Sequence, residues 1–200
     1  MQFSYKVMAL VREFPNAFRS RRIQEARVPV SPQPTSSMRS RVTALQVLFV
    51  CTGNTCRSPS AEGVLRKYLA DAGLGDRISV DSAGTQNDRS GQAPDPRAVH
   101  SCAQRGYDLT DLRARSLTPG DFETFDIIAA MARGHVEILQ RLCPPGQSHR
   151  LQLFLDHAQP PLKGQDVPDP YYGGPDDYEH VLDLIEHGMS GLIAHLQGRL

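Results

Sequence analysis

The feature that most constrains this fold is an apolar run that leads through a short loop into a helix start. Residues 45–50 read Leu-Gln-Val-Leu-Phe-Val and predict a strand buried on both faces. A loop with Gly53 and Asn54 follows, and Ser58, a proline and Glu62 indicate the start of a helix. Because unpaired N–H groups at a helix N-terminus favour anions, this order of elements predicts a site for a phosphate-like group.

Two side chains in the loop add chemistry to anion binding. Cys51 stands at the strand end, six positions before Arg57, whose planar guanidinium can bind two phosphate oxygens at once. A helix N-terminus and a guanidinium also stabilise a thiolate, so the groups that attract phosphate favour a nucleophile. The alternative for Cys51 is a buried core cysteine. A Walker A loop is excluded, because no Gly-Lys-Ser/Thr closes the turn.

Residues 49–59, Phe-Val-Cys-Thr-Gly-Asn-Thr-Cys-Arg-Ser-Pro, resemble the signature loop of the low-molecular-weight protein tyrosine phosphatases. The chain from about residue 44 onward follows that family's order. The resemblance implies hydrolysis of phosphotyrosine in protein substrates through a cysteinyl-phosphate intermediate, with no metal and no cofactor. It makes Cys51 and Arg57 catalytic, and it places Ser82 against Asn54. The phosphate-binding and supporting residues would be Thr52, Gly53, Asn54, Thr55, Cys56, Ser58 and Ser82.

A phosphate monoester also needs an acid, because its leaving oxygen must be protonated. Asp169 lies between two prolines, followed by Tyr171 and Tyr172. On composition alone this is an ordinary Asp-Pro turn. The resemblance to the family's Asp-Pro-Tyr-Tyr segment instead identifies Asp169 as the general acid. Tyr171 and Tyr172 would then wall the cleft, where a substrate ring could stack; the alternative is a pair of surface tyrosines.

The other cysteines and the histidines give weaker indications. Cys56 is either a small packing residue under the loop or a redox partner of Cys51, and such a pair recurs in the family that the chain resembles. Cys102 and Cys143 fit neither a disulfide framework nor a zinc pattern. The histidines of the last predicted helix fit a solvated face better than a metal site, and no metal site is expected.

Alternating buried strands and helices predict the fold class. The expected strands are residues 45–50, 77–81, 126–131 and 151–155, and the expected helices are residues 58–72, 95–106, 135–142 and 178–196. This order predicts an α/β fold: a three-layer, doubly wound sheet of four parallel strands with helices on both faces. The anion loop would lie at the carboxyl end of a strand.

Residues 1–44 differ from the rest of the chain. They carry eight basic and two acidic residues, a net charge of +6, whereas the whole chain is neutral. A Pro/Ser stretch and weak periodicity predict a disordered extension before a phosphatase domain at 45–200. Three accounts of the extension compete: a basic arm for nucleic acid or an acidic surface, an Arg/Ser-rich transit peptide, or a segment absent from the working protein. The family pattern begins near residue 44, which favours the third account or a tail without a role. We expect a cytoplasmic protein, with no nucleic-acid partner and no membrane association.

Three other functions are open at this point. Thr55 stands where many tyrosine phosphatases have a branched aliphatic residue, and related arginine phosphatases also carry threonine in the loop. Those enzymes tend to have phenylalanine where this chain has Tyr171, which favours phosphotyrosine. An arsenate reductase would need a closely spaced cysteine pair, unlike Cys102 and Cys143. A pure phosphate-binding module would need neither a nucleophile nor an acid.

Overall fold

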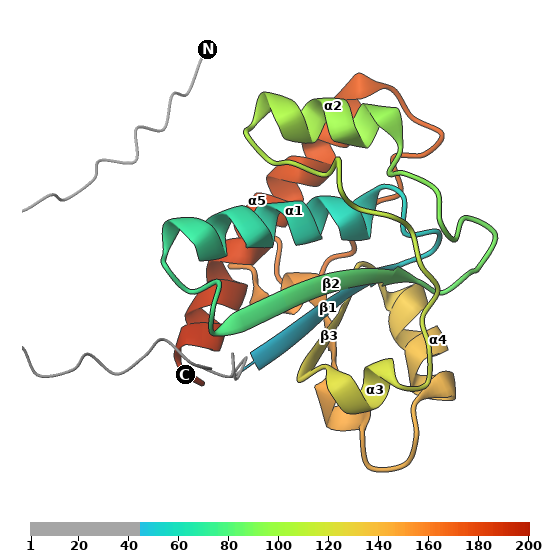
Figure 1. Ribbon diagram of the computed structural model, residues 1–200, viewed down its shortest axis with the longest axis vertical. Coiled ribbons are helices and arrows are strands. Elements are labelled where there is room, and N and C mark those ends of the chain that lie inside the picture. The colour runs from blue at the N-terminus through green and yellow to red at the C-terminus, as the bar shows by residue number, and fades with distance from the viewer. Residues whose placement is uncertain (1–44) are drawn as a thin grey trace, which may run out of the picture. The chain divides into compact units, whose positions relative to one another are not determined.

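The computed structural model describes residues 45–200, so the expectations for residues 1–44 lie outside the described residues. Within 45–200, four parallel strands form one sheet in the order β2-β1-β3-β4 (Figure 1). The strands are β1 (Leu45–Cys51), β2 (Ile78–Gly84), β3 (Ile127–Ala130) and β4 (Leu151–Leu153). The α-helices are α1 (Arg57–Asp71), α2 (Pro96–Gln104), α3 (Asp121–Thr124), α4 (Arg133–Leu142) and α5 (Pro175–Gln197).

Helices cover both faces of the sheet, which confirms the predicted fold class. On one face, α1 and α5 pack on the sheet and α2 lies against both of them (Figure 1). On the other face are α3 and α4. Successive side chains of a strand point to opposite faces, so Val47 and Phe49 join the first core, while Leu48 and Val50 join the second. Strand β1 is therefore apolar throughout because both of its faces are buried.

The predicted fourth strand is shorter than expected. It ends at Leu153, and a 3-10 helix, η2 (Phe154–His157), follows it; another, η1 (Ser148–Arg150), precedes it. Phe154 and Leu155 are both fully buried in the core that contains α5, and the Phe154 ring packs edge-on against Phe49 at 5.6 Å between centroids. A strand would turn one of these two neighbours to the opposite face, whereas a tight helical turn directs both into the same core.

The start of α1 also differs from the prediction. The helix begins at Arg57, and its N-cap Cys56 makes no side-chain capping hydrogen bond. Ser58 and Glu62, which suggested a helix start, are buried and bond to the loop and to β2 instead. The start of α2 follows the prediction, because Asp95 caps it through the amide of Arg97 and Pro96 occupies its first turn.

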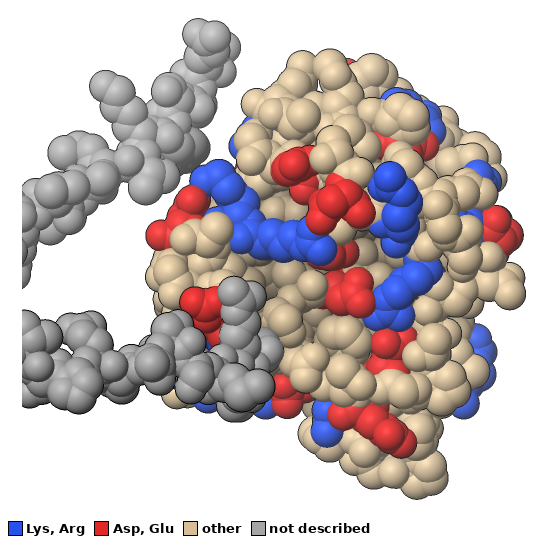
Figure 2. Space-filling view, in the orientation of Figure 1, with Lys and Arg blue, Asp and Glu red and all other residues tan. Residues whose placement is uncertain are grey.

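Charged side chains of both signs lie beside one another on the face drawn in Figure 2. Arg66 pairs with Asp111, and Lys67 pairs with Asp71 one helical turn away. Among the described residues, no helix combines the length and the apolar character needed to cross a bilayer.

Candidate active site

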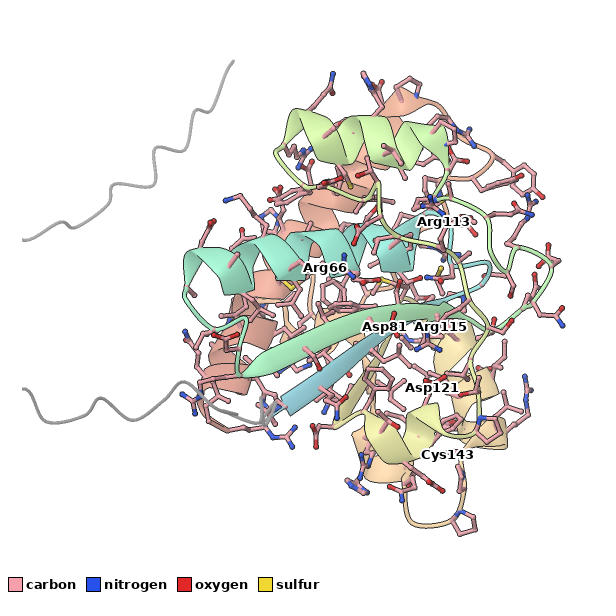
Figure 3. All side chains as sticks on the ribbon, in the orientation of Figure 1. Arg66, Asp81, Arg113, Arg115, Asp121 and Cys143 are labelled. Carbon is pink, nitrogen blue, oxygen red and sulfur yellow. The ribbon has the colours of Figure 1, made fainter. Side chains whose placement is uncertain are left out.

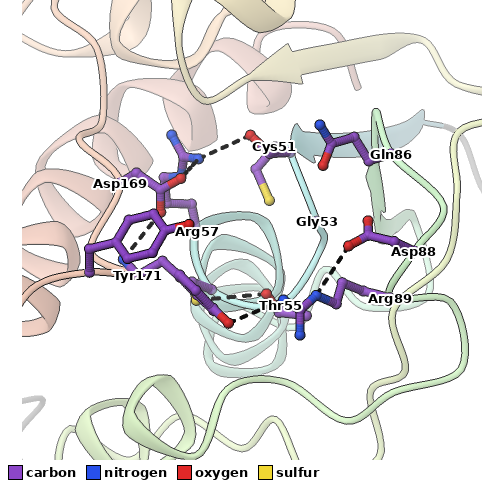
Figure 4. Close-up of a pocket in the computed structure, with 12 residues that line it drawn as sticks. Cys51, Gly53, Thr55, Arg57, Gln86, Asp88, Arg89, Asp169 and Tyr171 are labelled. Carbon is purple, nitrogen blue, oxygen red and sulfur yellow. Dashed lines mark hydrogen bonds and ion pairs between the residues drawn. The ribbon is translucent and has the colours of Figure 1, made fainter.

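The loop between β1 and α1 forms the floor of a pocket of about 360 Å³ at the carboxyl end of the sheet (Figure 4). Cys51 is the last residue of β1, and its side chain is 2% exposed. Residues from three separate segments line the pocket: Cys51, Thr52, Gly53, Thr55, Cys56, Arg57, Gln86, Asp88, Arg89, Asp169, Tyr171 and Tyr172.

Neighbouring segments hold the loop by its carbonyl groups. The carbonyls of Cys51 and Thr52 accept hydrogen bonds from the amides of Thr85 and Gln86, and the Thr55 carbonyl accepts one from Asp95. In a trans peptide the following N–H points away from the carbonyl. We infer that several loop amides therefore face the interior of the loop, where an anion would be bound.

Asn54 braces the loop from inside the protein. It has a positive φ of 54°, in the left-handed region that asparagine tolerates better than most residues. Its Nδ2 donates to the hydroxyls of Ser58 at 2.9 Å and Ser82 at 2.8 Å, and its Oδ1 accepts from the amide of Arg115 at 2.8 Å. The loop conformation is thus fixed by three hydrogen bonds to a side chain that is 2% exposed.

Two charged groups extend this support. The Ser82 hydroxyl donates to Glu62 Oε2 at 2.6 Å, and Arg66 pairs with the same carboxylate at 2.6 Å. Burial raises the pKa of Glu62 above its ordinary value, although Ser82 and Arg66 act in the opposite direction. Arg115 lies between Asp81 and Asp121 in Figure 3 and pairs with both, which holds in place the amide that reaches Asn54.

The two loop cysteines have different surroundings. The Cys51 sulfur lies 3.0 Å from the Ser58 hydroxyl, which can donate to a thiolate. The Cys56 sulfur is buried 3.7 Å from the Tyr178 hydroxyl, and burial raises the pKa of Cys56 to about 11. Both cysteines are free thiols in the structure, and a reversible disulfide between them stays a prediction.

Arg57 extends from the first turn of α1 along the pocket (Figure 4). Its NH2 group donates to Asp169 Oδ2 at 2.5 Å and to Thr52 Oγ1 at 3.3 Å, and its NH1 group donates to the Val167 carbonyl at 3.4 Å. The guanidinium is therefore held from three directions, and both of its terminal nitrogens lie at the site. A bound anion would compete with Asp169 for these donors.

Asp169 belongs to a loop that is anchored to the sheet. The amide of Val167 donates to the carbonyl of Met131, just after β3, and the carboxylate of Asp166 accepts from the amide of Arg133 at the start of α4. The Asp169 side chain is 47% exposed, so it reaches the pocket from a fixed backbone while remaining open to solvent.

The outer rim of the pocket is aromatic and charged. The rings of Tyr171 and Tyr172 meet edge to face at 5.0 Å, and Tyr172 is 95% exposed. Arg89 donates to the Tyr171 hydroxyl at 3.1 Å and pairs with Asp88 (Figure 4). Arg97 lies 5.7 Å from the Tyr171 ring centroid and donates to the Tyr171 carbonyl. These contacts hold Tyr171 in place, whereas the side chain of Tyr172 is exposed at the rim.

The structure also brings in residues that sequence reasoning missed. Gln86, Asp88 and Arg89 line the pocket. The strand predicted over residues 77–81 gave no signal for them beyond their place after a strand end. His135 Nε2 lies 2.9 Å from the Thr52 hydroxyl in the loop. No sequence pattern pointed to His135, which lies in the first turn of α4.

The remaining cysteines and the histidines of α5 lie outside the pocket. Cys102 is buried in the core beside α1, and Cys143 packs beside the core on the other face of the sheet, so neither lines the pocket. Within residues 45–200, no group of three His, Cys, Asp or Glu side chains has the placement of a metal site. His180, His187 and His195 are exposed on α5, as their helical spacing predicted.

Comparison with known proteins agrees with this geometry. Residues 46–199 match the family described as Low molecular weight phosphotyrosine protein phosphatase. The chain is 42% identical over 151 residues to the low molecular weight protein-tyrosine-phosphatase of Streptomyces coelicolor, covering 74% of this chain and 92% of that protein. It is 40% identical over 135 residues to the low molecular weight phosphotyrosine protein phosphatase of Sus scrofa, covering 68% and 85%.

Solved structures give the same result. The crystal structure of a protein tyrosine phosphatase from Entamoeba histolytica, with Hepes in its active site, superposes with a TM-score of 0.74 at 36% identity, covering 78% of this chain and 99% of that one. A match over most of the chain, at this identity and with the same fold, decides the assignment. This chain belongs to the low molecular weight protein tyrosine phosphatase family.

Proposed function

We propose that residues 45–200 form a catalytic domain that removes phosphate from phosphotyrosine in proteins through a phosphocysteine intermediate. The observation that supports this most is that Cys51, Arg57 and Asp169, from a strand end, a helix start and a distant loop, line one pocket. A nucleophile, an anion-binding guanidinium and an acid in one pocket suffice for this chemistry.

In the first step the Cys51 thiolate attacks phosphorus, forming the S–P bond while the bond to the tyrosine oxygen breaks. Arg57 and the loop amides bind the equatorial oxygens as charge redistributes in the transition state. Asp169 transfers its proton to the leaving oxygen. Because the bound phosphoryl group takes over the Arg57 donors, the 2.5 Å ion pair between Arg57 and Asp169 is released, and the freed carboxylate takes up from solvent the proton that it then donates.

In the second step water attacks phosphorus and the S–P bond breaks, returning the thiolate. Asp169, now a carboxylate, accepts a proton from that water. Ser58 lies 3.0 Å from the sulfur and donates a hydrogen bond to it, which stabilises the thiolate as a leaving group.

The aromatic residues at the rim of the pocket favour a phosphorylated aromatic side chain as the substrate. Tyr171 and Tyr172 flank the opening, and an aromatic ring can stack there while its phosphate reaches the loop. A phosphotyrosine side chain is also long enough to extend from a protein surface into a pocket whose floor is Cys51. Phosphoarginine is the alternative substrate that the experiment below separates.

We place this activity in the cytoplasm. The mechanism needs Cys51 as a reduced thiol, and Cys51, Cys56, Cys102 and Cys143 are all free in the structure. A compartment that keeps thiols reduced suits this set of cysteines.

The test is hydrolysis by the purified full chain of a phosphotyrosine peptide and a phosphoarginine peptide of the same sequence, in the presence of a chelator. Cys51→Ser serves as the blank. Faster phosphate release from the phosphotyrosine peptide supports the proposal. Faster release from phosphoarginine would assign the protein to the alternative substrate, and release from neither would contradict a phosphatase function.

A further inference from the structure

The Thr52 hydroxyl connects the Arg57 guanidinium to a buried histidine on another element. Thr52 Oγ1 lies 3.3 Å from Arg57 NH2 and 2.9 Å from His135 Nε2. His135 is 6% exposed and comes from the first turn of α4, 83 residues along the chain. The mechanism above gives this histidine no part.

The donor and acceptor roles in this series of hydrogen bonds depend on the tautomer of His135. Arginine can only donate, so Thr52 Oγ1 accepts from Arg57. The other hydrogen bond of Thr52 Oγ1, among the described residues, is the one to His135 Nε2. In the tautomer that we assign, the ring proton is on Nδ1 and Nε2 accepts the hydroxyl proton of Thr52, so the hydrogen bonds run from Arg57 through Thr52 to His135.

The surroundings of His135 keep it neutral. Burial and the positive charge of Arg57 on α1 lower the pKa of His135 to about 4, against the opposing effect of Asp166 and Asp169 on the acid loop. At neutral pH the ring therefore carries no charge that would repel Arg57.

We propose that His135 is a positioning residue that holds the Arg57 guanidinium against the phosphate loop through the Thr52 hydroxyl. This rests on the proposed function only in taking Arg57 as the group that binds phosphate. A hydroxyl that donates to one partner accepts more strongly from another, so the His135 bond strengthens the contact between Thr52 and Arg57. The ring thereby limits the rotation of a guanidinium that has no hydrogen bond to its Nε among the described residues.

The experiment measures binding of inorganic phosphate by calorimetry, which does not depend on turnover, together with kcat and KM. Thr52→Val removes the hydroxyl, and His135→Leu removes the acceptor. Each should weaken phosphate binding about tenfold, and the double variant should be no weaker than either one, because both act through the same hydroxyl. His135→Gln, which places an amide near the position of Nε2, should recover most of the affinity, as should Thr52→Ser.

Independent, multiplicative effects of the two changes would overturn the proposal. Wild-type phosphate affinity in the His135→Leu variant would also overturn it. So would a failure of both His135→Gln and Thr52→Ser to recover affinity, provided that these two variants unfold at the same urea concentration as the wild type. A chain that binds phosphate but does not hydrolyse the phosphotyrosine peptide would contradict the proposed function and leave the calorimetric test of His135 intact.

Discussion

Replacement of Asn54 by alanine tests how the loop is held. The Arg115 amide would lose its acceptor, at a cost of about 1–3 kcal/mol for a donor removed from water. Ser58 and Ser82 would each lose one hydrogen bond but keep others, at about 0.5–1.5 kcal/mol apiece. Alanine at φ 54° adds about 1–2 kcal/mol of backbone strain.

We therefore expect Asn54→Ala to lower the free energy of unfolding by about 3–8 kcal/mol, a large part of the usual stability of a domain. Asn54→Gly is the matched control, because it loses the same hydrogen bonds while glycine adopts a positive φ freely. It should be more stable than the alanine variant by about 1 kcal/mol.

Urea unfolding of the three proteins, followed by circular dichroism, measures both differences. Equal stability of the alanine and glycine variants would refute the argument from backbone strain. A loss below about 1 kcal/mol in both variants would refute the argument that these hydrogen bonds brace the loop.

Cys51→Ser should abolish phosphate release from a phosphotyrosine peptide while calorimetry still detects inorganic phosphate binding; retained turnover would exclude Cys51 as the nucleophile. Asp169→Asn should slow hydrolysis about 10²–10⁴-fold for aryl phosphates with poor leaving groups and much less for good ones, and an equal loss across the series would contradict its role as the acid. Arg89→Glu should move the kcat/KM preference from peptides with acidic neighbours of phosphotyrosine toward peptides with basic ones, since Arg89 lines the pocket; an unchanged ratio would remove it from substrate binding. Burial lowers the pKa of His135 from 6.5 to about 4. Between pH 6.5 and pH 4 this histidine is therefore protonated in the unfolded chain but not in the native protein. Stability should thus fall as the pH drops from 6.5 to 4, by up to about 3 kcal/mol from this residue. His157 shifts in the same direction, so urea unfolding of His135→Gln should lose about half of the pH dependence, and an unchanged pH dependence would contradict this reasoning.

Local sequence was enough for most of the elements and for the motif of the loop. Period-2 and period-3.6 patterns follow from which faces are buried, so β1, α1, α2 and α5 could be predicted within a few residues. An anion-binding loop could be predicted from the motif between Cys51 and Ser58 because its residues contact one another at short sequence separation. The fourth strand was overextended because a run of apolar residues does not distinguish a strand from a tight turn into the same core, as Phe154 and Leu155 show.

Only the tertiary structure decided which distant groups meet. Asp169 reaches Arg57 across 112 residues, and the family resemblance could suggest this partnership but not the ion pair between them. From the sequence Glu62 indicated a helix start, whereas in the structure its buried carboxylate accepts a hydrogen bond from the Ser82 hydroxyl. His135 carried no local signal, because its role depends on α4 packing where its ring meets Thr52. Periodic patterns record the burial of each element separately, whereas contacts between elements depend on how all of them pack together.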